Sequence, residues 1–278
     1  MAIWTIAKTT VGEAMRKKVL NVCLIVALAM IVLSLSFTQL GFRQDMTVVK
    51  ALGLFVIMLA GFIISVLMSI SLIPTEIERR TIYTILSKPV SRVEFLLGKY
   101  LGGIITLFIN IALMGTVFIV TVAIKAKLTA VQIGSIHGMQ VGEEVIKPQL
   151  FDPSLALGVV LIYLQFVVLA AVVILFSTFL TPTVNFFASS AFYVIGSAAN
   201  VWRTMYMNEK ATVFVKGFYW FISTFVANFD RYSVQNKLIH PEEVASMPAY
   251  VAAILAYSIL YCILTMLVAV LCFYRKEV

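Results

Sequence analysis

The chain has 278 residues, of which 62% are hydrophobic and 12% are charged, and its mean hydropathy is +1.02. Soluble domains are about 45–50% apolar and about 25% charged, so this composition excludes a water-soluble protein and indicates one that lies in a lipid bilayer. The net charge of +8 does not indicate nucleic-acid binding, because the basic residues gather at the ends of apolar stretches and form no stripe interleaved with aromatic residues.

Uncharged runs of sequence predict the membrane-spanning helices. Four runs, at 19–42, 51–75, 100–124 and 244–274, each have room for one helix, because about 20 apolar residues cross the hydrocarbon core. The fifth run, 153–202, has room for two helices, with a turn expected at its Thr-Pro-Thr sequence. The sequence therefore predicts an all-α membrane protein with six transmembrane helices, at about 19–40, 51–73, 100–124, 154–178, 184–202 and 248–273.

The distribution of Lys and Arg predicts the orientation of these spans. With the N-terminus inside, the inner segments hold 11 of the 21 basic residues in about 54 positions, and the outer segments hold 10 in about 85. Because Lys and Arg are enriched in cytoplasmic loops, both termini are expected to be cytoplasmic.

Two segments outside the spans are predicted to lie along the membrane surface. Residues 1–18 are too short and too polar to span, and their apolar residues recur at helical spacing, which is typical of an interfacial helix. The outer loop 203–247 contains an aromatic stretch at 217–226, which we interpret as an interfacial or re-entrant helix because aromatic rings favour the membrane–water boundary. The alternatives are a cytosolic extension of the first span and a seventh span, respectively.

The most charged part of the chain is 74–99, between the second and third predicted spans. It contains two pairs, Thr75 with Glu78 and Ser91 with Glu94, that have the S/T-x-x-E spacing of a capping box. In a capping box the two side chains satisfy backbone N–H groups at the start of a helix. The segment is therefore expected to contain two helix starts.

Pro89 separates these two starts, because proline cannot continue a helix. The sequence predicts a short helix at 76–86, a break at 87–90 and a second helix from 92 that runs into the third span. A short, charged, amphipathic helix suits docking into a groove of a partner protein. The alternative is a solvated loop with arginines on the cytoplasmic side.

The motif of this segment resembles a loop found in a known transporter family. It comprises Glu76, Glu78, Thr81, Ile82, Ile85, Leu86, Ser87, Pro89, Val90, Ser91, Arg92, Glu94, Phe95, Gly98 and Lys99. With this spacing it resembles the cytoplasmic loop of ABC transporter permeases of the type-two exporter class, and most of all the bacterial permeases grouped with gliding-motility systems and with copper-site maturation of nitrous oxide reductase. Many members have Gly where this chain has Arg80.

The resemblance implies roles for both cytoplasmic segments. Residues 74–99 would contain the coupling helix that docks on a cytoplasmic ATPase subunit, and 1–18 would be the elbow helix. The expected assembly has two ATPase subunits and a second permease chain, as a homodimer or a heterodimer, in the inner membrane of a prokaryote, with export favoured over import. The residues expected to contact the ATPase subunit are Glu76, Glu78, Arg79, Arg80, Pro89, Arg92 and Glu94.

Motifs of other function classes are missing from the sequence. It has no G-x-x-x-x-G-K-[ST] phosphate-binding loop, so the chain is expected to be no enzyme and to bind no cofactor, and ATP would be used by the partner subunit. An intramembrane protease is disfavoured, because both His residues and Asp45, Asp152 and Asp230 fall in predicted loops. A channel or ion-coupled carrier is disfavoured by the lack of ionisable groups within the predicted spans, and it stays an alternative together with a non-transporting scaffold.

Polar and small residues within the spans are interpreted mainly as packing residues. The small residues of the fifth span could form a subunit interface or pathway lining, or could pack within the chain. The cysteines, Cys23, Cys262 and Cys272, form no CxxC pair and are interpreted as apolar packing residues. The residues expected to form interhelical hydrogen bonds are Asn21, Gln39, Asn110, Gln165 and Asn185.

Overall fold

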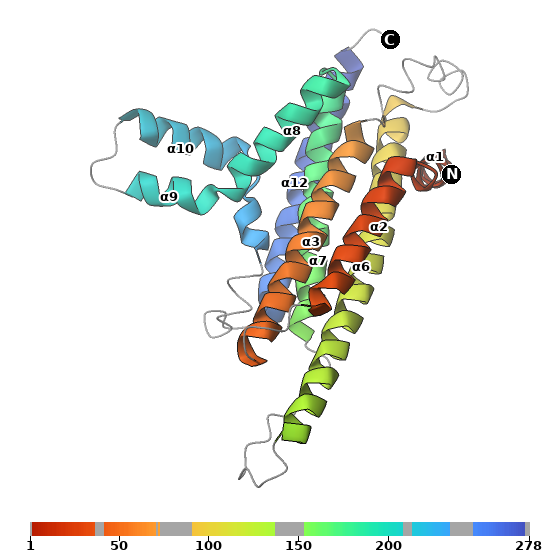
Figure 1. The fold of residues 1–278 in the computed structure, drawn as a ribbon. Coiled ribbons are helices and arrows are strands. Elements are labelled where there is room, and N and C mark those ends of the chain that lie inside the picture. Colours follow the sequence, from red (N-terminus) through yellow and green to blue (C-terminus); the bar gives the residue numbers. More distant parts are fainter. Residues whose placement is uncertain are drawn as a thin grey trace.

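The structure is a computed structural model, and it describes residues 2–36, 42–70, 72, 91–136, 153–207, 213–233 and 247–275. All regular elements in these ranges are helices, which run as a bundle with one lateral hairpin (Figure 1). They are α1 (Ala2–Met15), α2 (Lys18–Leu33), η1 (Ser34–Ser36), α3 (Phe42–Ile70), α6 (Arg92–Ile136), α7 (Pro153–Ser177), α8 (Pro182–Ser197), α9 (Ala199–Met207), α10 (Val213–Phe225), η2 (Phe229–Tyr232) and α12 (Met247–Arg275).

The described part of the chain contains five helical segments that are long and apolar enough to cross a membrane, or six if the bent pair α8–α9 counts as one span. This confirms the prediction of a multi-pass, all-helical membrane protein. The Thr-Pro-Thr turn is also confirmed, because α8 begins with Pro182 at its first position, where proline's fixed φ is favourable. The five segments are Lys18–Ser36, Val48–Ile70, Arg92–Leu128, Ser154–Ser177 and Ala249–Tyr274.

The predicted fifth span, 184–202, is not one straight helix. Its two halves, α8 and α9, differ in direction by 53°. The break follows Gly196 and Ser197, and Gly/Ser pairs are common sites of sharp helix kinks. Beyond the break, α9 and α10 pack side by side and project across the direction of the bundle helices (Figure 1).

The helix α7 forms the centre of the bundle, in contact with α3, α6, α8 and α12. In its most apolar stretch 78% of the residues are buried, compared with 22% in α2 and 28% in α12. A helix that is apolar on all sides is typical of such a central position. The outer helices instead expose aliphatic residues such as Ile25 and Leu264, which indicates that they face lipid or another chain.

The third predicted span, 100–124, belongs to a longer helix, because α6 continues to Ile136. The C-terminal part of α6 contacts the end of the first span. There the buried Lys125 Nζ donates a hydrogen bond to the Leu35 carbonyl oxygen over 3.3 Å. This carbonyl lies in η1 at the end of the first span, where helical carbonyl groups lack partners in their own helix. Because α6 continues to Ile136, it extends beyond the predicted span into the segment that the sequence predicted as an outer loop.

The N-terminal helix α1 packs closely on α6. It buries Ala7, Thr10 and Ala14, which recur at helical spacing. The opposing residues of α6 include Gly98 and Gly102, and a Cβ atom at Gly102 would lie 2.8 Å from the Ala7 carbonyl oxygen. The two glycines thus permit a close backbone approach that any larger residue would prevent.

We predict that Gly102→Ala destabilises the protein by about 1–3 kcal/mol, because overpacking forces the neighbouring backbone to move. The added methyl group would meet α1 backbone and the Thr10 Cβ atom, which would lie 2.6 Å away. Thermal unfolding of the purified protein in detergent measures the change. The control is Gly12→Ala, because a Cβ atom there has nothing within 4 Å. Equal unfolding midpoints for the two variants would contradict the close approach.

Candidate functional site

The first candidate site is the end of the bundle at which the predicted coupling segment joins α6. The structure confirms the capping box at this helix start. The Ser91 backbone N–H donates to Glu94 Oε2 over 2.9 Å, and the Glu94 backbone N–H donates to Ser91 Oγ over 3.2 Å. This reciprocal pair gives α6 a well-defined first turn at Arg92, as predicted. The other predicted box, Thr75 with Glu78, lies outside the described residues.

Arg92 links the start of α6 to the end of α12. Its Nη1 atom donates a hydrogen bond to the Phe273 carbonyl oxygen over 3.3 Å, and its Cζ atom lies 5.9 Å from the Phe273 ring centroid. The rings of Phe95 and Phe273 stack with centroids 6.5 Å apart. A cation at the C-terminal end of a helix is favourable for the helix dipole as well. The contact therefore holds two helix ends together that are 181 residues apart in the sequence.

A second contact links α6 to the N-terminal helix. Lys99 Nζ lies 3.5 Å from Glu13 Oε2, and the Lys99 side chain is only 4% exposed whereas that of Glu13 is 60% exposed. Burial of an unpaired ammonium group is costly, so the carboxylate of α1 stabilises the charge on α6. Together with Arg92, this ion pair places α1 and the last turn of α12 at the same end of the bundle (Figure 1).

The predicted contact residues divide into two groups. Arg92 and Glu94 lie within the junction of α1, α6 and α12 (the α6 junction), and both make contacts inside the chain. The sequence pattern identified the cap, but nothing in it pointed to the partnership of Arg92 with Phe273. The remaining predicted contact residues lie outside the described part of the chain, and they are Glu76, Glu78, Arg79, Arg80 and Pro89.

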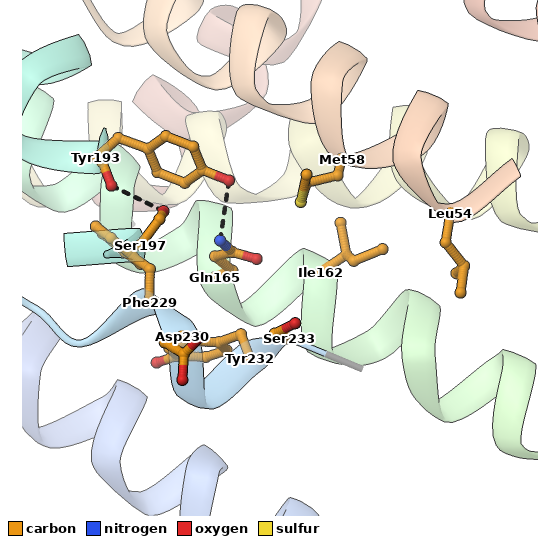
Figure 2. Close-up of a pocket in the computed structure, with 10 residues that line it drawn as sticks. All are labelled: Leu54, Met58, Ile162, Gln165, Tyr193, Ser197, Phe229, Asp230, Tyr232 and Ser233. Atoms are coloured by element: carbon orange, nitrogen blue, oxygen red, sulfur yellow. Dashed lines mark hydrogen bonds between the residues drawn. The ribbon is translucent and has the colours of Figure 1, made fainter. Parts of the chain in front are cut away.

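The second candidate site is a cavity of about 250 Å³ within the bundle (Figure 2). One wall is apolar and the other carries polar groups, so the cavity could hold a small amphipathic molecule. Side chains from α3, α7, α8 and the segment around η2 form its walls, and they are Leu54, Met58, Ile162, Gln165, Tyr193, Ser197, Phe229, Asp230, Tyr232 and Ser233.

Hydrogen bonds order the polar wall of this cavity. Gln165 Nε2 donates to the Tyr193 hydroxyl over 3.1 Å, and Ser197 Oγ donates to the Tyr193 carbonyl oxygen over 2.8 Å (Figure 2). The Tyr193 ring is held by Phe62, whose ring centroid lies 4.8 Å away. The sequence predicted an interhelical bond for Gln165 but did not single out its partner.

Two other predicted interhelical bonds are confirmed. Asn185 is fully buried, and its Nδ2 atom donates to the Val173 carbonyl oxygen of α7 over 3.1 Å. Asn21 Nδ2 donates to the Met15 carbonyl oxygen over 3.2 Å, which joins α2 to α1. Asn110 differs, because its amide donates to Thr106 within the same helix. Gln39 lies outside the described residues.

Side chains of α12 stabilise the irregular backbone that follows α10. The Tyr257 hydroxyl accepts a hydrogen bond from the Asn228 backbone N–H over 3.1 Å, and the Tyr261 hydroxyl donates to the Phe225 carbonyl oxygen over 3.1 Å. Tyr250 donates to the Arg231 carbonyl oxygen. Backbone polar groups away from water need such partners, so these tyrosines fix the path of the segment that carries η2.

Tyr232 anchors η2 itself to α12. Its hydroxyl lies 2.6 Å from Ser258 Oγ, and Ser258 donates its own proton to the Ile254 carbonyl oxygen over 2.8 Å. Tyr232 is therefore the donor in the pair. Burial raises the pKa of the Tyr232 phenol, so the group keeps its proton at physiological pH.

Removal of this anchor should loosen η2. We predict that Tyr232→Phe and Ser258→Ala each destabilise the protein by about 0.5–1.5 kcal/mol, because both remove the buried hydrogen bond between the two side chains. Ser258→Ala also removes the bond of Ser258 to the Ile254 carbonyl oxygen within α12. A double-mutant cycle on thermal unfolding in detergent should show that the two effects are not additive. The control is Tyr206→Phe, whose side chain is exposed. Strict additivity of the two substitutions would contradict the contact.

The small residues of α8 serve partly in packing within the chain. A Cβ atom at Gly196 would lie 2.4 Å from the Ala227 carbonyl oxygen, so this glycine permits the segment before η2 to approach α8. Ser189 Oγ donates to Asn185 Oδ1 over 2.8 Å inside the bundle. The opposite face of the helix is apolar and exposed, with Phe187 and Val194 at its centre.

The described ranges contain no group of three or more His, Cys, Asp or Glu side chains that could hold a metal ion. The three cysteines are free thiols. Comparison with known protein families and with curated proteins found no match to this chain.

Proposed function

We propose that this chain is the membrane subunit of an ABC transporter, and that it couples ATP hydrolysis by a separate ATPase subunit to the movement of a substrate across the membrane. The observation that carries the proposal is the motif of residues 76–99, which runs directly into the α6 junction. A multi-pass helical bundle, which the chain has, is a requirement for such a subunit.

The α6 junction supports the proposal through its rigidity. A docking segment transmits force only if the helix that follows it does not unravel or swing freely. Here the first turn of α6 is capped by Ser91 and Glu94 and is bound to α12 through Arg92. Lys99, two turns further along, binds α6 to α1. A displacement at residue 91 would therefore move three helices together.

The length of α6 would carry that displacement across the membrane. The helix has 45 residues, which corresponds to about 68 Å at 1.5 Å per residue. It contacts α1, α2, α3, α7 and α12, so a tilt of α6 would repack most of the bundle. Rocking of packed helices about an interface is a common way to alternate access between the two sides of a membrane.

The finer parts of the proposal follow from the family resemblance. In this assembly α1 would serve as the elbow helix, the segment 74–99 would include the coupling helix, and the α6 junction would face the cytoplasm of a prokaryotic cell. Two copies of the chain, or this chain and a related permease, would bind two ATPase subunits. Export is the favoured direction.

Glu78→Ala tests the docking segment. We predict about 10–100-fold weaker association with the ATPase subunit, because loss of a hydrogen bond to a charged group costs about 1.5–3 kcal/mol. Co-purification in mild detergent, with titration of the ATPase subunit, measures the effect. The matched control is Lys8→Ala, which removes an exposed charge from α1. Undiminished association of the Glu78 variant, or labelling of Lys88 from outside the cell, would refute the docking assignment.

Arg92→Ala tests transmission rather than docking. We predict that the variant complex still hydrolyses ATP, whereas ATP no longer alters the probe environment at the far part of α6. The probe is a fluorescent label on Lys127→Cys, an exposed position, in a background without the three native cysteines. The control is Arg92→Lys, which keeps the charge. An ATP-dependent signal of full size in the Arg92→Ala complex would contradict the role of the α6 junction.

A further inference from the structure

A second cavity, of about 420 Å³, lies where the lateral hairpin meets the bundle. Its walls come from the end of α8, from α9 and α10, from η2 and from Tyr257 of α12. The cavity of Figure 2 is lined by other residues apart from Asp230, which lines both cavities. The hairpin cavity is distant in sequence from the motif that supports the transporter assignment, and its properties are independent of that assignment.

The hairpin cavity is lined by two arginines and one acidic residue. Arg203 comes from α9 and Arg231 from η2. Neither guanidinium forms an ion pair within the described part of the chain. The carboxylate of Asp230 accepts a hydrogen bond from Asn200 Nδ2. The site therefore has an excess of positive charge and suits an anionic group.

The geometry of the arginines favours a phosphate. The Arg231 Cζ atom lies 5.2 Å from the Tyr257 ring centroid, and this cation–π contact limits the freedom of the side chain. Two other donors of the lining are in use, since Trp202 Nε1 donates to the Ile195 carbonyl oxygen and Ser223 Oγ donates to the Trp220 carbonyl oxygen. The guanidinium groups of Arg203 and Arg231 are the cationic groups of the lining, and their planar forks match the oxygen atoms of phosphate groups.

The surroundings of the cavity favour a lipid over a soluble phosphate. The helices α9 and α10 lie across the direction of the bundle helices (Figure 1), and their outer faces carry exposed apolar side chains. Aromatic residues beside basic ones are typical of the head-group level of a membrane. The exposed apolar residues of the hairpin are Val201, Met205, Tyr206, Met207, Phe218, Trp220 and Phe225.

We propose that the hairpin cavity binds the phosphate-bearing head group of an anionic membrane lipid, whose acyl chains lie along the apolar faces of α9 and α10. Arg203 and Arg231 contact the phosphate from two separate elements. One lipid molecule thus bridges the hairpin and η2, and it holds the hairpin against the bundle.

The test is binding of defined lipids to the delipidated, purified full-length chain, measured by native mass spectrometry. The probes are phosphatidylglycerol, diacylglycerol with the same acyl chains, and inorganic phosphate. We expect phosphatidylglycerol to bind about tenfold or more tightly than diacylglycerol. We expect the double variant Arg203→Gln/Arg231→Gln to lose this preference and Arg203→Gln alone to lose part of it.

The control variant is Lys216→Gln/Lys127→Gln, which also removes two positive charges but from exposed positions outside the cavity lining. It should keep the preference for phosphatidylglycerol. The proposal is overturned if diacylglycerol binds as tightly as phosphatidylglycerol, if the double arginine variant binds like the unaltered chain, or if the control pair loses affinity equally. Competition by inorganic phosphate as strong as that by the lipid would also overturn it, because the site would then recognise a soluble anion.

Discussion

In hydrocarbon a backbone N–H or C=O group without a partner is costly, and at several helix ends in the described part of this bundle a side chain supplies one. The clearest case is the backbone around η2, which bonds three tyrosines of α12. Tyr250 and Tyr261 donate to backbone carbonyl oxygens, and the Tyr257 hydroxyl accepts from the Asn228 backbone N–H. Where the chain bends between α8 and α9, Trp202 donates to the Ile195 carbonyl oxygen across the break. These partners from α12 and α9 hold the bend after α8 and the segment of η2, whose Asp230 lines both cavities.

The two ends of α12 have different tasks in this arrangement. Near its C-terminus the Phe273 carbonyl and ring hold Arg92 and so contribute to the α6 junction. Nearer its N-terminus, between Tyr250 and Tyr261, it holds the segment that carries η2. A tilt of α6 transmitted to α12 would thus reach η2, whose Asp230 lines both cavities. This gives the proposed transport function and the proposed lipid site a physical connection through one helix.

A second feature that recurs in this bundle is the close approach of neighbouring segments at glycine residues. Gly98 and Gly102 bring α1 onto α6, and Gly196 brings the segment before η2 onto α8. Gly53 and Gly61 of α3 likewise face the rings of Phe118 and Phe166. Apolar side chains gain little from leaving lipid, so tight van der Waals contact becomes a main source of helix association in a membrane. The glycines are thus essential to the packing, although most of them lie within helices.

The amino-acid sequence alone determined the features that depend on local chemistry. The apolar runs predicted the spanning helices, Pro182 predicted the turn between α7 and α8, and the spacing of Ser91 and Glu94 predicted the start of α6. Each follows from residues within a few positions of one another. The sequence also suggested that the stretch at 217–226 is too short to span, and α10 has 13 residues.

Only the tertiary structure decided which distant residues meet. Gly196, just before the bend, packs against Ala227 and Phe229 from another part of the chain. The pairing of Arg92 with Phe273 joins residues whose separation carries no local signal. The same holds for the hairpin cavity, since Arg203 and Arg231 come together through the folding of α9, α10 and η2. Hydropathy and capping patterns act over a few residues, whereas these contacts depend on how whole helices pack.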